Sequence, residues 1–145
     1  DILHGGTGDD FIHGRRGKNR IYGGHGNDRI FDGDGTSFID TGPGRNTVNL
    51  GHGDDEVIVG TGVNQINPGS GAVTFRVAYG GVTIIERWNS EQTYDLSLWP
   101  DTPEVVQLPD KRVRLRLGLS IVEIRQVKDA DAIAGQICTE QDEKS

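Results

Sequence analysis

The chain of 145 residues is poor in several residue types that usually stabilise a folded domain. Cys138 is its one cysteine, so the chain cannot form a disulfide within itself. Hydrophobic residues make up 33% and aromatic residues 6%, which is little material for an ordinary hydrophobic core. No apolar run approaches the roughly 18 residues of a membrane-spanning helix, so no membrane span is expected. The fold therefore needs another source of stability.

Positive charge is also scarce. The net charge is −7, and acidic residues outnumber basic ones both up to residue 76 and after it. A nucleic-acid partner is therefore not expected, and the basic residues between Arg15 and Arg20 are interpreted as compensating charge in an acidic block. The four histidines and Cys138 form no pair with metal-site spacing, which argues against zinc.

Glycine, in contrast, is abundant, with 22 residues, many of which recur every nine positions. From Gly5 the chain divides into eight units: GGTGDDFIH, GRRGKNRIY, GGHGNDRIF, DGDGTSFID, TGPGRNTVN, LGHGDDEVI, VGTGVNQIN and PGSGAVTFR. The fourth place is always glycine: Gly8, Gly17, Gly26, Gly35, Gly44, Gly53, Gly62 and Gly71. The eighth place is always apolar: Leu3, Ile12, Ile21, Ile30, Ile39, Val48, Val57, Ile66 and Phe75. A fixed period of this kind indicates a solenoid of stacked repeats.

Each recurrent place within the unit has a physical reason. Glycines supply the positive φ angles of a tight turn. The last three places form a short strand whose middle side chain points inward, because strand side chains alternate between faces. One inward aliphatic side chain per strand makes no core alone, so the units must stack. Two units then form one coil, with a turn on each side and two parallel sheets.

The sixth place is an acid or amide in most units: Asp1, Asp10, Asn19, Asp28, Asn46, Asp55 and Asn64. Neighbouring coils lie ~4.8 Å apart, so these side chains converge with turn carbonyls of the adjacent coil. Such an all-oxygen, flexible set of ligands suits Ca²⁺. Calcium would also neutralise acidic charge and supply the missing stability, which makes folding and binding one event.

The unit resembles GGxGxDxUx, the calcium-binding nonapeptide of RTX (repeats-in-toxin, hemolysin-type) proteins. The resemblance implies an all-β fold, a right-handed parallel β-roll or calcium solenoid. It further implies that each Ca²⁺ lies between turns and is bound by carbonyls of places one to four and by two sixth-place side chains. The residues that match these ligands are Asp1, Gly5, Thr7, Asp10, Asn19, Gly23, Gly24, His25, Gly26, Asp28, Thr41, Gly42, Gly44, Asn46, Asp55, Gly60, Gly62 and Asn64.

Units two apart lie on the same side of the roll, so the ligands divide into two columns. The sixth places of the first side are Asp10, Asp28, Asn46 and Asn64. Those of the second side are Asp1, Asn19, Ser37, Asp55 and Val73. Place one also changes, from glycine in the first three units to Asp32 and other residues later, which leaves the backbone less free. We therefore expect fewer ions than repeats, concentrated on the first side near the N-terminal end.

The chain after the repeats has a different pattern. We expect a β-roll over residues 1–76, an antiparallel β cap over 77–128, and a short helix and disordered tail over 129–145. The expected cap strands are 75–79 and 82–88 around a glycine turn, then 95–99, 104–108 and 111–121. Leu119 is expected on the apolar face of the last strand, and Trp88 and Trp99 in the cap core.

The predicted function is a calcium-binding module without catalytic activity. Asp9–Asp10 and Asp54–Asp55 are explained by their places in the repeat rather than as catalytic carboxylate pairs. The resemblance implies a secreted, extracellular bacterial exoprotein, such as a toxin or adhesin, that uses type I secretion and folds on Ca²⁺ outside. The chain has no N-terminal signal peptide and begins inside a repeat, so we expect it to be part of a longer protein.

Two alternatives stay open from the sequence. The first is a polysaccharide-binding accessory module, similar to the R-modules of alginate epimerases, although the net charge of −7 disfavours an acidic glycan. The second is a static, metal-poor solenoid, favoured by Asn, Ser and Val in the sixth place. The target receptor or glycan cannot be identified from these residues.

Overall fold

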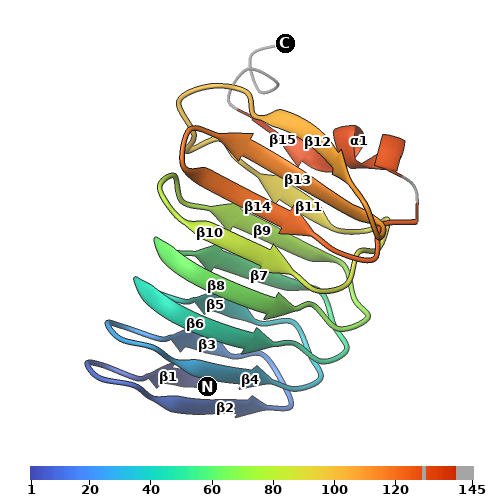
Figure 1. Ribbon diagram of the computed structural model, residues 1–145. Helices are drawn as coiled ribbons and strands as arrows, with labels where there is room; N and C mark the ends of the chain where they lie inside the picture. The colour runs from blue at the N-terminus through green and yellow to red at the C-terminus, as the bar shows by residue number, and fades with distance from the viewer. Residues whose placement is uncertain (129, 140–145) are drawn as a thin grey trace.

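The computed structural model describes residues 1–128 and 130–139, and the chain winds through them as a stack of β coils (Figure 1). The strands of one sheet are β1 (Ile2–His4), β3 (Arg20–Tyr22), β5 (Phe38–Asp40), β7 (Asp55–Val59), β9 (Val73–Val77), β11 (Thr93–Asp95) and β15 (Ile137–Cys138), hydrogen-bonded in that order. Those of the other sheet are β2 (Phe11–Arg15), β4 (Arg29–Asp32), β6 (Gly44–Asn49), β8 (Gly62–Asn67), β10 (Val82–Ile85), β14 (Ser120–Ile124), β13 (Arg112–Leu117) and β12 (Glu104–Leu108), again in spatial order. The predicted parallel β-roll is confirmed.

The core is the space between the two sheets. Eighth-place residues 18 positions apart pair in register, as Ile21 does with Ile39 in one sheet and Ile30 with Val48 in the other. All four of these side chains are completely buried. Each of these four strands thus buries an apolar residue at the eighth place, and only stacking removes it from water.

Parallel winding continues past residue 76, where we expected the cap to begin. β10 pairs in parallel with β8, which places Ile85 on Ile66, and β11 pairs in parallel with β9, which places Tyr94 on Phe75. Two strands do flank the predicted glycine turn, but β9 and β10 lie in different sheets, so the antiparallel pairing expected in this part of the cap is wrong. A further parallel rung covers the exposed apolar edge of the roll as effectively as a hairpin would. A division at residue 76 stays a prediction.

Antiparallel pairing joins β12 to β13 and β13 to β14 at the C-terminal end of the roll (Figure 1). The predicted single strand over 111–121 is wrong, because a turn at Gly118–Leu119 divides it. Gly118 has a φ of +60° and Leu117 pairs with Ser120, an arrangement that suits a two-residue hairpin loop with glycine first. Leu119 consequently lies at the hairpin tip and is 90% exposed.

The predicted strand over 95–99 is also wrong, since β11 ends at Asp95. The Asp95 carboxylate accepts a hydrogen bond from the backbone N–H of Ser97 at 3.0 Å, and the N–H of Trp99 donates to the carbonyl of Leu96 at 2.9 Å. These bonds form a turn, and the turn still buries Leu96 and Trp99. Trp88 is half-buried and packs against the core.

The predicted short helix is present as a 3₁₀ turn, η1 (Ala130–Ala132), and one α-helical turn, α1 (Ile133–Gln136), followed by β15. The predicted disordered tail falls almost wholly on residues 140–145, which lie outside the described residues. Within the described part of the chain, no helix has the length and apolar character to cross a membrane.

Candidate metal centre

The turns on each side of the roll stack directly on one another. On the first side, Gly8 and Gly26 occupy the fourth place of successive turns, with φ of +96° and +121°. A Cβ on Gly26 would lie 2.1 Å from the carbonyl oxygen of Gly8. Glycine therefore permits both the turn conformation and the close approach of the next coil.

The first-side carboxylates each have one buried oxygen without a partner among the described residues. Asp28 Oδ1 accepts a hydrogen bond from the N–H of Asp10 in the preceding coil at 2.9 Å. The Oδ2 atoms of both Asp10 and Asp28 are buried and have no hydrogen-bond partner in the part of the chain that the structure describes. Burial raises the pKa of Asp28 and the charge of Asp10 raises it further, against a lowering by the bond from the Asp10 N–H. A buried carboxylate oxygen without a partner is costly unless a cation approaches it.

Carbonyl oxygens lie beside these unpartnered atoms. A methyl group placed on Gly5 would lie 2.4 Å from the carbonyl oxygen of Gly23 and 2.9 Å from Asp10 Oδ2. One placed on Gly23 would lie 2.5 Å from the carbonyl oxygen of Thr41 and 2.8 Å from Asp28 Oδ2. Carboxylate and carbonyl oxygens of adjacent coils thus converge beside a glycine, and this hard, all-oxygen set fits Ca²⁺.

The later turns of the first side satisfy their own carbonyls. Asn46 Nδ2 donates to the carbonyls of Thr41 and Gly42, both at 3.1 Å, and Asn64 Nδ2 donates to that of Gly60 at 3.0 Å. These are carbonyls that the resemblance assigns to calcium. In this arrangement an amide N–H group takes the place of a cation, so the need for a metal is greatest at Asp10 and Asp28.

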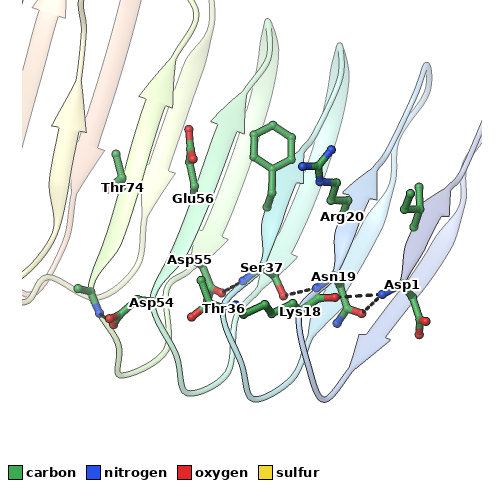
Figure 2. A pocket seen from close by; sticks show the side chains of 13 residues that line it. Asp1, Lys18, Asn19, Arg20, Thr36, Ser37, Asp54, Asp55, Glu56 and Thr74 are labelled. Carbon is green, nitrogen blue, oxygen red and sulfur yellow. Dashed lines mark hydrogen bonds between the residues drawn. The ribbon is translucent and has the colours of Figure 1, made fainter.

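The sixth-place column of the second side forms a chain of hydrogen bonds (Figure 2). The nitrogen of Asp1 donates to Asn19 Oδ1 at 3.3 Å, the N–H of Asn19 to Ser37 Oγ at 3.3 Å, and the N–H of Ser37 to Asp55 Oδ1 at 2.9 Å. Asp55 Oδ2 is buried without a partner among the described residues. Burial raises the pKa of Asp55 to about 6, with smaller contributions from the charges of Asp32 and Asp54.

Asp32 lies beside this column, although the repeat pattern marks it only as a loss of glycine from place one. Its side chain is 7% exposed, and its Oδ1 accepts a hydrogen bond from Asn19 Nδ2 at 3.2 Å. Its Oδ2 atom is buried and unpartnered within the described part of the chain. The sequence offers one signal for this role of Asp32: it is an acidic residue at place one, where a strand ends and a turn begins.

The remaining predicted ligands line the same turns. Thr7 and His25 pair as neighbours at the exposed turn tips, and Asp1 is exposed at the end of the roll. Over residues 1–128 and 130–139, no group of three or more His, Cys, Asp or Glu side chains gathers to hold a metal. A cation site in these turns must therefore draw on carbonyl oxygens, and the individual ligand assignments stay predictions.

The fifth-place acids do not form catalytic pairs with their neighbours. Asp9 Oδ1 accepts a hydrogen bond from the N–H of Asn27 at 2.8 Å, and Asp54 Oδ1 accepts one from the N–H of Ala72 at 3.0 Å. Both acids are exposed on the outside of the turns. They join successive coils along the outer surface, whereas the sixth-place acids face inward.

Stacked turns that direct buried carboxylate and carbonyl oxygens between adjacent coils define a calcium-binding β-roll module. The family model of the RTX calcium-binding nonapeptide repeat, in four copies, matches residues 1–30 and 31–66. The repeat segment of this chain is thus built of RTX repeats, and the predicted repeat type and its Ca²⁺ cofactor are confirmed.

Several solved structures are similar to this chain, including an epimerase subunit and a lipase. The AlgE6R3 subunit of the mannuronan C5-epimerase from Azotobacter vinelandii, a solution structure, shares 21% identity over 92% of this chain and 79% of its own, with a TM-score of 0.54. The extracellular lipase LipA from Serratia marcescens shares 13% identity over 90% of this chain and 38% of its own, with a TM-score of 0.43. A comparison with curated proteins finds no match. The first likeness supports the β-roll fold.

Proposed function

We propose that this chain is a calcium-operated folding module of a secreted bacterial exoprotein, unfolded at low Ca²⁺ and folded outside the cell. The observation that supports this proposal is the set of buried, unpartnered carboxylate oxygens on Asp10, Asp28 and Asp55. In the folded chain without metal these charges are uncompensated, so a cation that binds only the folded state stabilises it.

The same reasoning connects the module to secretion. Extracellular calcium modules bind with Kd values of about 10⁻⁴–10⁻³ M, which lies above cytosolic Ca²⁺ and near extracellular levels. A chain that stays unfolded in the cytosol suits passage through a type I secretion channel. Folding after export then stabilises and presents the rest of the exoprotein, for which a toxin or an adhesin is our proposal.

Circular dichroism during a calcium titration tests the proposal. In EDTA the spectrum should be mostly that of coil, and millimolar Ca²⁺ should convert it to β in a cooperative transition, while equal Mg²⁺ should not. Mg²⁺ is the suitable control because it requires strict octahedral geometry and gives up its water reluctantly. A β spectrum that persists unchanged in EDTA would instead support the static solenoid.

A second candidate function is binding of a polysaccharide. Aromatic and histidine rings pack against one another along the strands: His4 and Tyr22 are stacked with ring centroids 4.9 Å apart, and Phe11 and Phe31 are tilted with centroids 5.1 Å apart. Phe11 is 67% exposed, and the similar epimerase subunit belongs to an enzyme named for mannuronan. Net charge opposes an acidic glycan, so this function ranks second. Calorimetric titration with oligomannuronate tests it: heat that Phe11→Ala abolishes would support it, and no heat would exclude it.

A further inference from the structure

An aspartate occupies place one in the fourth unit, where the first three units have glycine. Asp32 is the last residue of β4, and its carboxylate extends towards the preceding second-side turn. A Cβ on Gly14 in that turn would lie only 2.4 Å from Asp32 Oδ1. Glycine at position 14 therefore leaves the room that the Asp32 side chain occupies.

A second carboxylate from the next coil shares this environment. Asp55 is 4% exposed, and Ser37 provides the hydrogen bond to its Oδ1. The Oδ2 atoms of Asp32 and Asp55 are both buried without a partner, and no ion pair within the described residues includes either side chain. Asn19 donates to Asp32 through Nδ2 and to Ser37 Oγ through its N–H, and Ser37 donates in turn to Asp55. The two carboxylates are therefore held on adjacent rungs of the same column. Two such buried charges require a counter-charge.

We propose that Asp32 and Asp55 together hold one Ca²⁺ on the second side of the roll, with Asp32 supplying the carboxylate that Ser37 lacks at the sixth place. This inference rests on the proposed calcium function, and it adds a ligand from a side chain at place one. Such a combination of a place-one and a sixth-place carboxylate occurs once on the second side. The next place-one residues on this side are Leu50 and Pro68, which have no side-chain oxygen.

A structural role for Asp32 is the competing explanation. In that case Asp32 only accepts the hydrogen bond from Asn19 Nδ2 and does not contact a cation. Asp32→Asn distinguishes the two, because its amide oxygen can still accept that bond while the negative charge is lost. Asp34→Asn is the matched control. Asp34 lies in the same turn and is exposed, and its carboxylate accepts a hydrogen bond from the N–H of His52.

Native mass spectrometry of the whole chain at saturating Ca²⁺ would count the bound ions. Asp32→Asn, Asp55→Asn and the double variant should each bind one Ca²⁺ fewer than the wild-type chain, because all three remove the same ion, and Asp34→Asn should bind the wild-type number. Equal numbers in Asp32→Asn and wild type would overturn the inference and leave the calcium function intact. A wild-type chain without bound Ca²⁺ would overturn both.

A crystal structure of the wild-type chain grown with Ca²⁺ makes the test independent of how the variants fold. An anomalous peak should lie within about 2.3–2.6 Å of a carboxylate oxygen of both Asp32 and Asp55. A fully occupied first side with no peak at Asp32 would sink the inference.

Discussion

Asn46 and Asp28 occupy the same place in adjacent coils and make the same backbone contact, yet they leave the turn in different states. Each uses Oδ1 to accept a hydrogen bond from the N–H of the preceding coil, at 2.8 Å for Asn46 and 2.9 Å for Asp28. The other terminal atom of Asn46 donates to two turn carbonyls, whereas that of Asp28 is buried without a partner in the described chain. One column therefore contains both a self-satisfied turn and a turn that needs a cation.

Asn46→Asp should convert the self-satisfied turn into one that depends on calcium. The substitution removes the donor to the carbonyls of Thr41 and Gly42 and adds a buried charge, which should cost about 1–3 kcal/mol without metal. With metal, the added carboxylate should raise the calcium affinity of the site that position 46 shares with Asp28. Calcium titrations followed by circular dichroism measure both effects. Asn27→Asp makes the same charge change on the exposed surface, so identical behaviour of the two variants would contradict this prediction.

Asp28→Ala should raise the calcium concentration at the folding midpoint more than Asp55→Ala. Asp28 lies between Asp10 and Asn46 and can serve a site with each, whereas the coil after Asp55 offers only Val73. Each lost 1.4 kcal/mol of binding free energy corresponds to about a tenfold change in affinity, and Asp28→Ala weakens two sites. The calcium concentration at the midpoint of the β transition, compared between the two variants, tests this prediction. An equal or larger shift from Asp55→Ala would show that position in the column does not govern affinity.

Tyr94→Ala should destabilise the calcium-bound roll by about 3–5 kcal/mol, the usual cost of deleting a large buried aromatic side chain. Tyr94 is completely buried and stacks on Phe75 with ring centroids 5.6 Å apart. Thermal unfolding at saturating Ca²⁺ measures the loss. Tyr79→Ala is the control because Tyr79 is 43% exposed, and it should cost much less.

Removal of everything after residue 76 tests the same packing on a larger scale. The shortened chain keeps all the RTX repeats but exposes Phe75 and the last apolar rung, so it should fold poorly even at high Ca²⁺. A titration curve that matches that of the full chain would mean that the C-terminal rungs are not needed as a cover.

Without calcium, the folded state should become more stable as the pH falls from 7 to 5. The pKa of Asp55 is raised from 3.8 to about 6 in the fold, chiefly by burial. The stability that its protonation contributes is therefore complete below pH 3.8 and is lost as the pH rises through 6. Saturating Ca²⁺ should reverse the sign, because protons then compete with the ion. Circular dichroism in EDTA should show a β signal that grows as the pH falls, and urea unfolding at saturating Ca²⁺ measures the opposite dependence. Asp55→Asn should flatten both.

The period of nine residues by itself determined most of the roll. Glycine at place four and an aliphatic residue at place eight act within one unit, so the turn, the inward residue and the stacking direction follow from local geometry. Sixth-place acids likewise predicted calcium. These features repeat in the sequence because each coil needs them in the same way.

Only the tertiary structure decided how neighbouring coils use their side chains. Asp32 lies beside Gly14, a contact between two different turns that the spacing within one unit does not determine. Asn46 directs its amide nitrogen at a carbonyl of its own turn, an orientation that the spacing also leaves open. The continuation past residue 76 has the same cause. Ile85 pairs with Ile66 at a spacing of 19 rather than 18, so the periodicity is interrupted while the packing of one apolar rung on the next is preserved.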